Sequence, residues 1–346
     1  MTDHRPGADE LPEERERQRD DAALGPGRLS PAAAGSAGAL VLDPRSSDLT
    51  LTYEAGVELK ARSQWSYARM RFFRHRLAVA SLVVLIAFGV IAVFAPQIAP
   101  YQYDELDLNN IAASPTLKDH HWFGTDFLGR DYLSRVIYGI RTSLWVAFFV
   151  ALLSTAIGTA IGAIAGYYGG HVDNLLMRMT DLILTLPGLA VLLVASVYVG
   201  QGKPFRVGLI LALLFWTGLA RIVRGLFLSL REKEFVEAAK AAGASDVRII
   251  LRHILPNCVG PIVVTMTLLI ATAILIEAAL SFLGFGIQPP QAALGKLIAE
   301  GETEGFSLWW LVTFPGLMIV IICLAVNFVG DGLRDALDPT QRRIRA

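Results

Sequence analysis

The chain has 346 residues, 53% of them hydrophobic, and its mean hydropathy is +0.48. Soluble domains are about 45–50% apolar, so this composition argues against an ordinary soluble globular protein. The formal net charge is 0, which excludes the global basic surface expected of a nucleic-acid-binding protein. The two cysteines, Cys258 and Cys323, are too few for a disulfide framework or a zinc site.

Residues 1–58 differ in composition from the rest of the chain. Residues 1–50 contain 10 acidic residues, 6 arginines, 5 prolines and 5 glycines, but no aromatic residue. Such a segment buries too little apolar surface to offset the entropy lost on ordering. We therefore expect residues 1–58 to form a disordered tail, which is either a solvated extension or a regulatory segment.

Residues 59–76 interleave basic and aromatic side chains. The basic ones are Lys60, Arg62, Arg69, Arg71, Arg74 and Arg76, and the aromatic ones are Trp65, Tyr67, Phe72 and Phe73. This mixture is typical of a helix that lies at a membrane interface. A nucleic-acid patch is the competing interpretation, which is disfavoured because an uncharged apolar segment follows at once.

Six apolar segments follow, each long enough to cross about 30 Å of hydrocarbon as a helix. They are Leu77–Ala95, Leu144–Tyr167, Leu182–Val199, Val207–Val223, Val259–Phe282 and Leu308–Val329. The sequence thus predicts an all-α membrane protein with six transmembrane helices. Residues 77–141 hold the first helix and a long loop, and residues 142–335 hold the remaining five helices.

Two of these segments carry residues that affect helix packing. Gly158, Gly162 and Gly166 recur every four residues in the second segment, which predicts close approach of another helix backbone. Pro187 lies inside the third segment, where it predicts a kink.

The distribution of Lys and Arg predicts the orientation of the chain. With the N-terminus inside, the inner segments contain 18 Lys and Arg residues and the outer segments contain 7. We therefore expect both termini in the cytoplasm, with residues 336–346 as a C-terminal cytoplasmic tail. A polar segment between the fourth and fifth helices, residues 231–257, is then cytoplasmic too; we call it the elbow.

The elbow is expected to form two short helices. Phe235, Ala238 and Ala242 give the first an apolar stripe, and Gly243 ends it in a left-handed turn. Ser245 is expected to cap the second helix, with Asp246 in its first turn. The second stripe consists of Val247, Ile250, Leu251 and Ile254. Pro256 is expected to end this helix before the fifth membrane helix begins.

A rigid, small-residue elbow suits insertion into a cleft of a partner protein. The residues to which we assign this role are Glu237, Ala238, Ala239, Gly243, Leu255 and Pro256. Glu237 supplies a charge that sets register, and Gly243 fixes the bend. The periodicity alone is equally compatible with an amphipathic loop that lies on the membrane surface.

The long outer loop ends in a charged stretch with two glycines. Its candidate gate or docking residues are Gly124, Asp126, Gly129, Arg130 and Asp131, and Asp131 is expected to pair with Arg135 on the helix surface. The stretch either seals an outer gate, seats a binding protein, or forms an internal salt-bridged cap.

Glu277 lies late in the fifth apolar segment. A carboxylate there costs about 3 kcal/mol if it faces lipid near the midplane, so it should face the bundle or water. It is either a gate residue or the acceptor of an interhelical hydrogen bond.

The chain lacks several signatures of chemistry. It has no phosphate-binding Gly-x-x-x-x-Gly-Lys-Ser/Thr sequence, no assembled Ser-His-Asp set and no His-Glu-x-x-His helix. The adjacent pair His120 and His121 is a weak metal site at best. We therefore expect a protein that is not an enzyme and that binds no metal or other cofactor itself.

Four stretches of sequence carry a family resemblance. They are Glu237–Pro256 with its Glu-Ala-Ala, Gly and Leu-Pro positions, His121–Leu144, Leu280–Gly286 and Asp331–Pro339. The chain resembles the C-type permease subunit of the dipeptide/oligopeptide/nickel ABC importers over about residues 71–339. His253 stands where the general importer pattern has Ile, as is usual in the peptide branch, and the long N-terminal tail is outside the family pattern.

The resemblance implies a type I importer permease (MetI-like) fold in the bacterial inner membrane, with the elbow as the family's EAA coupling loop. It also implies four kinds of contact: a homologous second permease subunit, two ATPase subunits that bind ATP and Mg, an extracytoplasmic substrate-binding protein, and membrane lipid. The cargo stays open among dipeptides, oligopeptides, nickel complexes, glutathione and haem.

Two other classes of function compete with this interpretation. A secondary transporter or channel should show paired buried charges or inverted repeats, whereas the apolar segments contain a single Glu. A membrane-embedded hydrolase requires a nucleophile and base, which the sequence does not supply.

Overall fold

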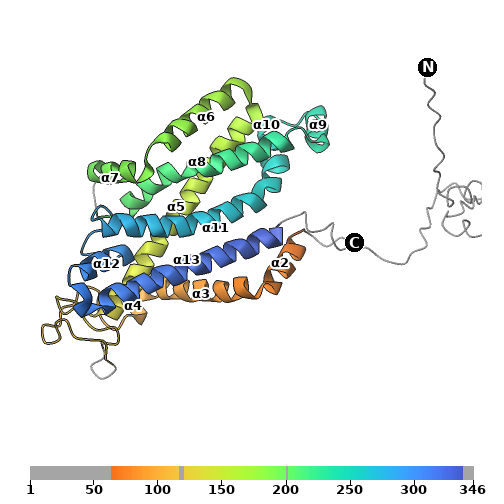
Figure 1. Cartoon of the computed structure of the whole chain (residues 1–346). Coiled ribbons are helices and arrows are strands. Elements are labelled where there is room, and N and C mark those ends of the chain that lie inside the picture. The colour runs from red at the N-terminus through yellow and green to blue at the C-terminus, as the bar shows by residue number, and fades with distance from the viewer. Residues whose placement is uncertain (1–63, 117–120, 200–201, 338–346) are drawn as a thin grey trace, which may run out of the picture. The chain divides into compact units, whose positions relative to one another are not determined.

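The computed structural model describes residues 64–116, 121–199 and 202–337, which are helices and loops with no strand beyond two isolated β-bridges. The all-α prediction is confirmed for this part of the chain. The helices are α2 (Gln64–Arg74), α3 (Arg76–Val93), α4 (Ala95–Ile98), α5 (Tyr132–Tyr168), α6 (Gly170–Thr185), α7 (Gly188–Val199), α8 (Pro204–Leu230), α9 (Glu234–Ala241), α10 (Asp246–Arg248), η2 (Ile249–Ile254), α11 (Leu255–Phe282), α12 (Leu294–Glu302), η3 (Gly305–Leu308) and α13 (Trp310–Leu337) (Figure 1). The predicted disordered tail 1–58 and most of the C-terminal tail lie outside the described residues.

Among the described residues, five helical segments are long and apolar enough to cross a membrane: α3, α5, α8, the continuous helix Asp246–Phe282, and α13. The predicted third span, Leu182–Val199, is not one helix. α6 and α7 meet there at an angle of 89°, so this crossing is a bent pair rather than a kinked rod. Figure 1 shows that the pair brings the chain back to the end of the bundle where α8 begins.

The break between α6 and α7 follows from the local sequence. Leu186 is extended, with φ −76° and ψ 140°, which is the conformation that a following proline favours. Pro187 has no N–H to donate to the preceding turn, and α7 restarts at Gly188. The prediction therefore placed the bend correctly at Pro187, but it expected a kink in one helix rather than a break between two helices.

The three glycines of α5 pack directly on α8, as their spacing predicted. A Cβ on Gly162 would lie 2.5 Å from the Ala220 oxygen and 2.8 Å from the Val223 Cβ, and one on Gly158 would lie 2.6 Å from the Trp216 oxygen. Backbone atoms cannot move out of the way as a flexible side chain can. The three glycines therefore allow the backbones of α5 and α8 to approach closely.

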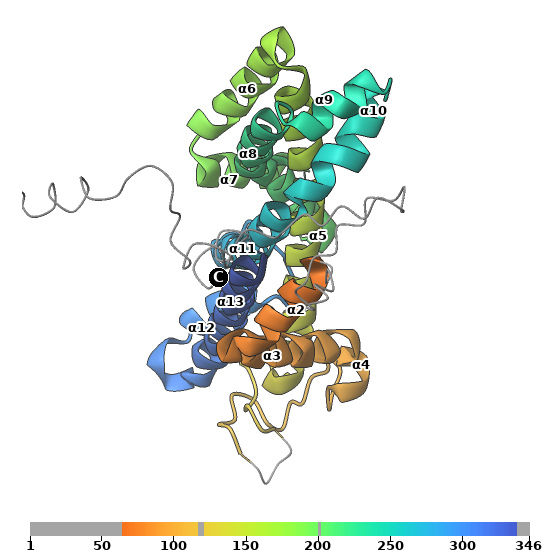
Figure 2. The ribbon, with the colours of Figure 1, turned by 90° about the vertical axis from the view of Figure 1, so that its right-hand side faces the viewer.

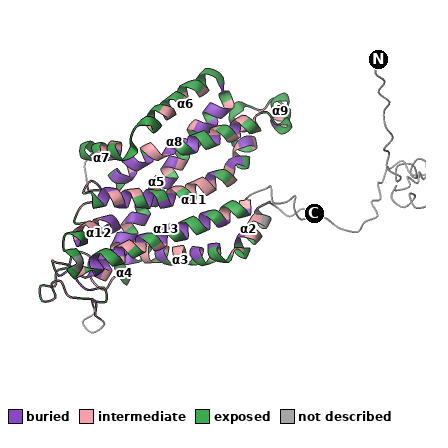
Figure 3. Ribbon diagram, viewed as in Figure 1, coloured by how far each residue is buried: buried purple, intermediate pink, exposed green. Residues whose placement is uncertain are grey.

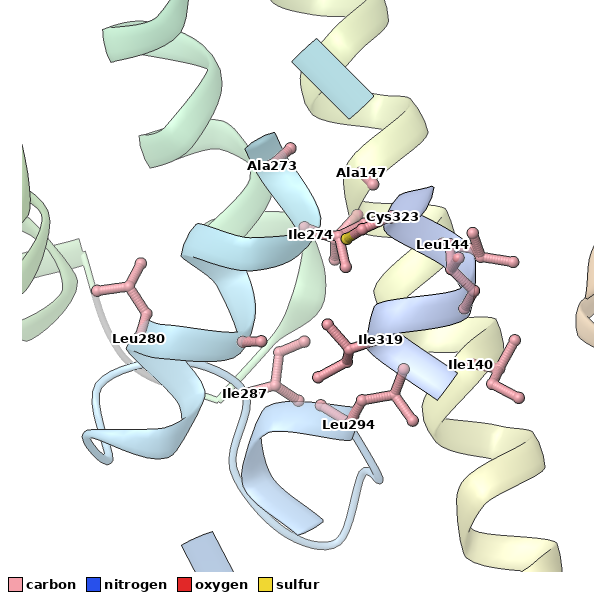
Figure 4. Packing of buried hydrophobic residues seen from close by; sticks show 14 of the residues in the cluster. Ile140, Leu144, Ala147, Ala273, Ile274, Leu280, Ile287, Leu294, Ile319 and Cys323 are labelled. Atoms are coloured by element: carbon pink, nitrogen blue, oxygen red, sulfur yellow. The ribbon is translucent and has the colours of Figure 1, made fainter. Parts of the chain in front are cut away.

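A single apolar cluster joins α5, α11, α12 and α13. Figure 4 shows Leu144 and Ala147 of α5 near Ile274 of α11 and Ile319 and Cys323 of α13. Farther along, Leu294 of α12 and Ile287 complete the cluster. This packing fixes α12 under the ends of the long helices, although α12 itself is too short to cross a membrane.

The predicted interfacial segment 59–76 is interrupted at its end. Within its described part, α2 stops at Arg74 and α3 starts at Arg76, because His75 Nδ1 accepts a hydrogen bond from the Ala78 N–H at 3.1 Å and so caps α3. Phe72 is buried against α13, whereas Phe73 is exposed. Figure 3 shows many further exposed residues along α3, α6 and α7.

The second membrane helix begins at Tyr132, not at Leu144 as predicted. Asp131 caps it by accepting a hydrogen bond from the Ser134 N–H at 2.8 Å. The prediction started too late because the first turns carry Arg135 and Arg141, which interrupt the apolar run. These turns lie beside α4 and α12, at the opposite end of the bundle from α9 and α10 (Figure 1).

Candidate functional site

The first half of the elbow is a short helix closed by a glycine turn. In α9 the Gly243 N–H donates to the Lys240 carbonyl at 2.9 Å, and the Ala244 N–H donates to the Ala239 carbonyl at 3.0 Å. Gly243 has φ +77°, a left-handed conformation that glycine adopts without steric cost. The predicted role of Gly243 in ending the helix is confirmed.

The second half of the elbow runs directly into the fifth membrane helix. α10, η2 and α11 form one helix from Asp246 to Phe282, so the expectation that Pro256 ends the elbow helix is wrong. Pro256 lies in the first turn of α11, where its missing N–H is accommodated by the wider turns of the π-helix η2. Ser245 stands at the capping position but makes no side-chain cap bond.

The elbow buries only part of the apolar stripes that its periodicity predicted. Val236, Ile249 and Ile254 are buried in a cluster with the ends of α5 and α8. Of the predicted stripe residues, Ile254 is buried and Ile250 packs against this cluster, whereas Phe235 is 42%, Val247 62% and Leu251 55% exposed. The sequence correctly assigned these apolar residues to the elbow helices. It did not show which of them pack against α5 and α8 and which stay exposed.

The candidate coupling residues divide in the same way. Glu237, Ala238, Gly243 and Pro256 are exposed, whereas Ala239 and Leu255 are half-buried against the cluster. Figure 2 shows α9 and α10 side by side at the end of the bundle facing the viewer. The elbow thus leaves the Glu237 carboxylate, small side chains and several apolar side chains exposed.

Polar contacts hold the elbow to the ends of the membrane helices. Tyr167 of α5 donates its hydroxyl to Asp246 Oδ1 at 2.7 Å. Arg231 donates from Nη1 to the carbonyls of Gly166 and Tyr167 at 3.3 and 3.4 Å. Because α5 packs on α8, these bonds connect the elbow to the same pair of helices that the glycines bring together.

At the opposite end of the bundle, Asp126 organises a buried ion cluster. Its Oδ2 atom lies 2.6 Å from Arg130 Nε and 2.7 Å from Arg135 Nη1, and Glu300 Oε2 lies 2.9 Å from the same Arg135 nitrogen. Asp126 and Arg135 are almost fully buried. This geometry favours the interpretation of an internal salt-bridged cap, because the cluster joins the loop to α5 and α12 and is not open to a ligand.

Asp131 makes other contacts than the predicted pair with Arg135. Besides capping α5, its Oδ1 lies 2.9 Å from His121 Nδ1. His121 is buried, its ring stacks on Tyr101, and its Nε2 lies 3.5 Å from Asp107 Oδ2. His121 is thus a packing residue of the loop, and no group of metal-ligating side chains occurs among the described residues.

The two loop glycines are required by their backbone. Gly124 has φ +76° and a Cβ there would lie 2.6 Å from the Ala113 oxygen, while Gly129 has φ +80° and a Cβ would lie 2.1 Å from the Asp107 oxygen. A residue with a side chain is disfavoured at both positions, because the backbone is left-handed and because a Cβ atom would clash with a neighbouring carbonyl oxygen. They shape the loop that carries Asp126.

Glu277 faces the interior of the bundle. It is fully buried, its Oε2 accepts from Ser143 Oγ of α5 at 2.9 Å, and its Oε1 accepts from Ser281 Oγ at 2.7 Å. Ser281 Oγ in turn accepts from the Ile287 N–H at 3.1 Å. Both carboxylate oxygens are engaged within the chain, which favours the interhelical hydrogen-bond interpretation over a gate that faces an open path.

Two ion pairs that sequence analysis missed fasten α6 to α8. Arg224 binds Asp173 with two nitrogens, Nε and Nη2, the latter at 2.6 Å from Oδ2, and Arg221 pairs with Asp181. The only sequence signal was the presence of charges near membrane boundaries. The elbow and the loop cluster around Asp126 lie at opposite ends of the bundle (Figure 1). They are therefore two separate candidate sites.

Residues 158–343 match the family described as binding-protein-dependent transport system inner membrane component, and residues 63–115 match the N-terminal TM domain of oligopeptide transport permease C. The oligopeptide transport system permease protein OppC of Escherichia coli (strain K12) is 41% identical over 303 residues, which cover 88% of this chain and 100% of that protein. The protein of the same name from Mycobacterium tuberculosis (strain ATCC 25618 / H37Rv) is 42% identical over 276 residues, covering 80% and 94%.

A solved structure was also compared with the chain. It is described as inward facing conformations of the MetNI methionine ABC transporter, and the match has a TM-score of 0.48 and 18% sequence identity. It covers 60% of this chain and 97% of that chain.

Proposed function

Because the chain belongs to the family of binding-protein-dependent transport system inner membrane components and is a multi-pass permease subunit of an ABC importer, we propose that its cargo is oligopeptides. The relatives named as oligopeptide permeases match almost the whole of the described chain. Dipeptides, nickel complexes, glutathione and haem, which the sequence left open, become the alternatives against which cargo is tested.

We propose that ATPase subunits drive this permease by binding the exposed surface of the elbow. Phe235, Val247 and Leu251 leave apolar surface uncovered at one end of the bundle, beside the exposed carboxylate of Glu237. Uncovered apolar side chains on a rigid helical turn are typical of a protein interface. We assign Glu237, Ala238, Ala239, Gly243, Leu255 and Pro256 to the docking of an ATPase subunit.

The orientation of the chain in the membrane is part of the proposal. The excess of Lys and Arg on the elbow side, 18 against 7, supports cytoplasmic termini and a cytoplasmic elbow. The loop cluster around Asp126 then faces the outside of a bacterial inner membrane, where a substrate-binding protein delivers cargo.

The full assembly that we propose has four kinds of contact partner. A homologous permease subunit supplies the other half of the path, two ATPase subunits bind ATP and Mg, and a binding protein docks outside, all in contact with membrane lipid. This chain itself binds no nucleotide and no metal. Its residues move and seal the path, and it performs no covalent chemistry.

The mechanism uses the continuity of the helix Asp246–Phe282. Closure of the ATPase subunits around ATP displaces the elbow, and α11 moves with it because no break separates them. Glu277 lies near the far end of that helix and bonds Ser143 of α5, so the displacement reaches α5 as well. Alternating access then results from rearrangement of α11 against its neighbours.

The proposal is tested by reconstituting the permease pair, ATPase subunits and binding protein in liposomes. Uptake of a labelled oligopeptide should require ATP, the ATPase and the binding protein, and unlabelled oligopeptides should compete better than nickel or glutathione. Uptake that continues without the ATPase contradicts the importer mechanism. Competition by nickel or glutathione alone contradicts only the cargo.

The elbow assignment has its own test, by co-purification of ATPase subunits in mild detergent. Leu251→Asp places a charge on the exposed elbow surface and should abolish recovery of the ATPase. Leu108→Asp is the matched control, an exposed leucine in the long loop at the other end of the bundle. Equal recovery from the two variants contradicts docking at the elbow.

A further inference from the structure

A pocket of about 280 Å³ opens beside the first turns of α5. Its wall combines four segments: the long loop, α5, the start of α8 and the segment that precedes α12. The side chains that matter here are Tyr103, Tyr138, Arg141, Thr142, Trp145 and Gln291. The pocket is distinct from the ion cluster around Asp126 and from the elbow, and nothing in the proposed function uses it.

The geometry of α5 assembles this pocket. Tyr138, Arg141 and Trp145 are spaced by three and four residues, so they lie on one face of the helix. Tyr103 of the long loop packs on Tyr138, with the two ring centroids 4.9 Å apart. Arg141 thus lies on the same helix face as Tyr138 and Trp145, and it is exposed.

The charge of the pocket lining is positive. Arg141 is the only charged side chain in its lining, and in the described part of the chain its guanidinium has no hydrogen-bond or ion-pair partner. The hydroxyls of Tyr103 and Tyr138 and the amide of Gln291 are further polar groups of the lining. A planar guanidinium with neighbouring donors is suited to a phosphate group.

The position of Arg141 along α5 identifies the source of that phosphate. Residues 142–172 contain no Asp, Glu, Lys or Arg, so Arg141 lies at the boundary of the apolar crossing, where lipid headgroups lie. Below it Trp145, Phe148 and Leu152 are 49%, 55% and 64% exposed. They continue the same helix face at four-, three- and four-residue steps, and so form an apolar strip.

We propose that this pocket binds one phospholipid, with its phosphate on Arg141 and an acyl chain along Trp145, Phe148 and Leu152. With the orientation proposed above, the lipid belongs to the outer leaflet. The bound lipid closes the space between the long loop and the start of α8, and so seals the side of the bundle next to Pro204.

The test uses the whole transporter, purified in detergent with its partner subunits, and counts retained phospholipids by native mass spectrometry. Arg141→Gln should lose about one phospholipid per complex, because the amide removes the charge that the phosphate needs. Arg141→Lys should restore it in part. Arg206→Gln is the matched control, an exposed arginine in the first turn of α8 outside the pocket; equal retention in all variants overturns the proposal.

The identity of the ligand is tested by placing a photo-crosslinking residue at position 148, on the apolar strip. In membranes that contain a radiolabelled phospholipid, the permease should become labelled, and excess inorganic phosphate should not prevent it. Crosslinking to the second permease subunit or to a labelled peptide instead of lipid overturns the proposal. ATP-dependent uptake measured on the same preparation reports separately on the proposed function, which does not require the lipid.

Discussion

Glu277 of α11 accepts a hydrogen bond from Ser143 of α5 at 2.9 Å. The bond joins two helices that also share the main apolar cluster, and the second carboxylate oxygen is taken by Ser281. A buried carboxylate whose two oxygens both accept from hydroxyls orients the helices that carry them. Glu277 therefore helps to set the orientation of α11 relative to α5.

Replacing Glu277 with alanine should destabilise the permease by about 1–3 kcal/mol, because two buried hydroxyls lose their acceptor. The measurement is thermal unfolding of the purified protein in detergent. Thr272→Ala is the matched control, since Thr272 is exposed on the same helix and bonds only its own helix backbone. Equal unfolding temperatures for the two variants would contradict the orienting role.

Replacing Gly162 with alanine should separate α5 from α8. The new Cβ would meet the Ala220 oxygen at 2.5 Å, and overpacking of this kind costs about 1–3 kcal/mol. Gly218→Ala on α8 has nothing within 4 Å of the new methyl group and serves as control. Unfolding in detergent should shift downward for the first variant only, and a shift common to both would point to a general effect of alanine.

Replacing Gly243 with valine should uncouple ATP hydrolysis from uptake and leave membrane insertion intact. The space around Gly243 is open, so the effect comes from its φ of +77°, which costs a residue with a Cβ about 1–2 kcal/mol and changes the turn of the elbow. Gly305→Val is the control, because Gly305 has φ +65° and equally open space at the other end of the bundle. Normal uptake by the Gly243 variant would argue against the elbow as the coupling element.

Replacing Asp126 with asparagine should destabilise the loop cluster by about 1–3 kcal/mol, because Arg130 and Arg135 lose the carboxylate they share and keep only Glu300 as a charged partner. Arg135 is buried, and its Nε already lacks a hydrogen-bond acceptor. Asp104→Asn, an exposed change in the same loop, is the control. Limited proteolysis of the loop should accelerate in the first variant only; unchanged cleavage would contradict the internal cap.

The long loop should also lose stability in acid through Asp107. Its pKa is lowered from the ordinary value, mainly by the hydrogen bond from the Asn110 side chain and then by the Asn109 N–H. Because the folded pKa is below the unfolded one, the stabilisation is complete above the unfolded value and is lost as pH falls through the folded value. Pepsin cleavage of the loop should rise below about pH 4, and Asp107→Asn should remove that part of the pH dependence.

Several parts of the fold followed from sequence alone because they depend on local physics. The apolar segments fix the membrane helices, the four-residue spacing of Gly158, Gly162 and Gly166 fixes a close helix contact, and Gly243 fixes a turn. In each case the residues of one short stretch of chain determine the local structure. The family resemblance rested on motifs that are equally local.

The sequence-based predictions were wrong where contacts between distant parts of the chain determine the structure. Arg135 was expected to pair with Asp131, four residues away, but Asp126 and Glu300 from other segments take it. Periodicity placed Phe235 in an apolar stripe without revealing whether the stripe packs inward. Likewise Pro187 indicated a bend, but its angle of 89° could not be read from the sequence.

The absence of any break between the elbow and α11 has a mechanical consequence. The helix Asp246–Phe282 has 37 residues and is about 55 Å long at 1.5 Å per residue. The π-helical turns of η2 and Pro261 interrupt the regular α-helical hydrogen bonding, so a displacement of the elbow both bends this helix near η2 and moves the residues beyond it. In the mechanism proposed above, ATPase docking and the opening toward the cargo therefore involve opposite ends of one continuous helix.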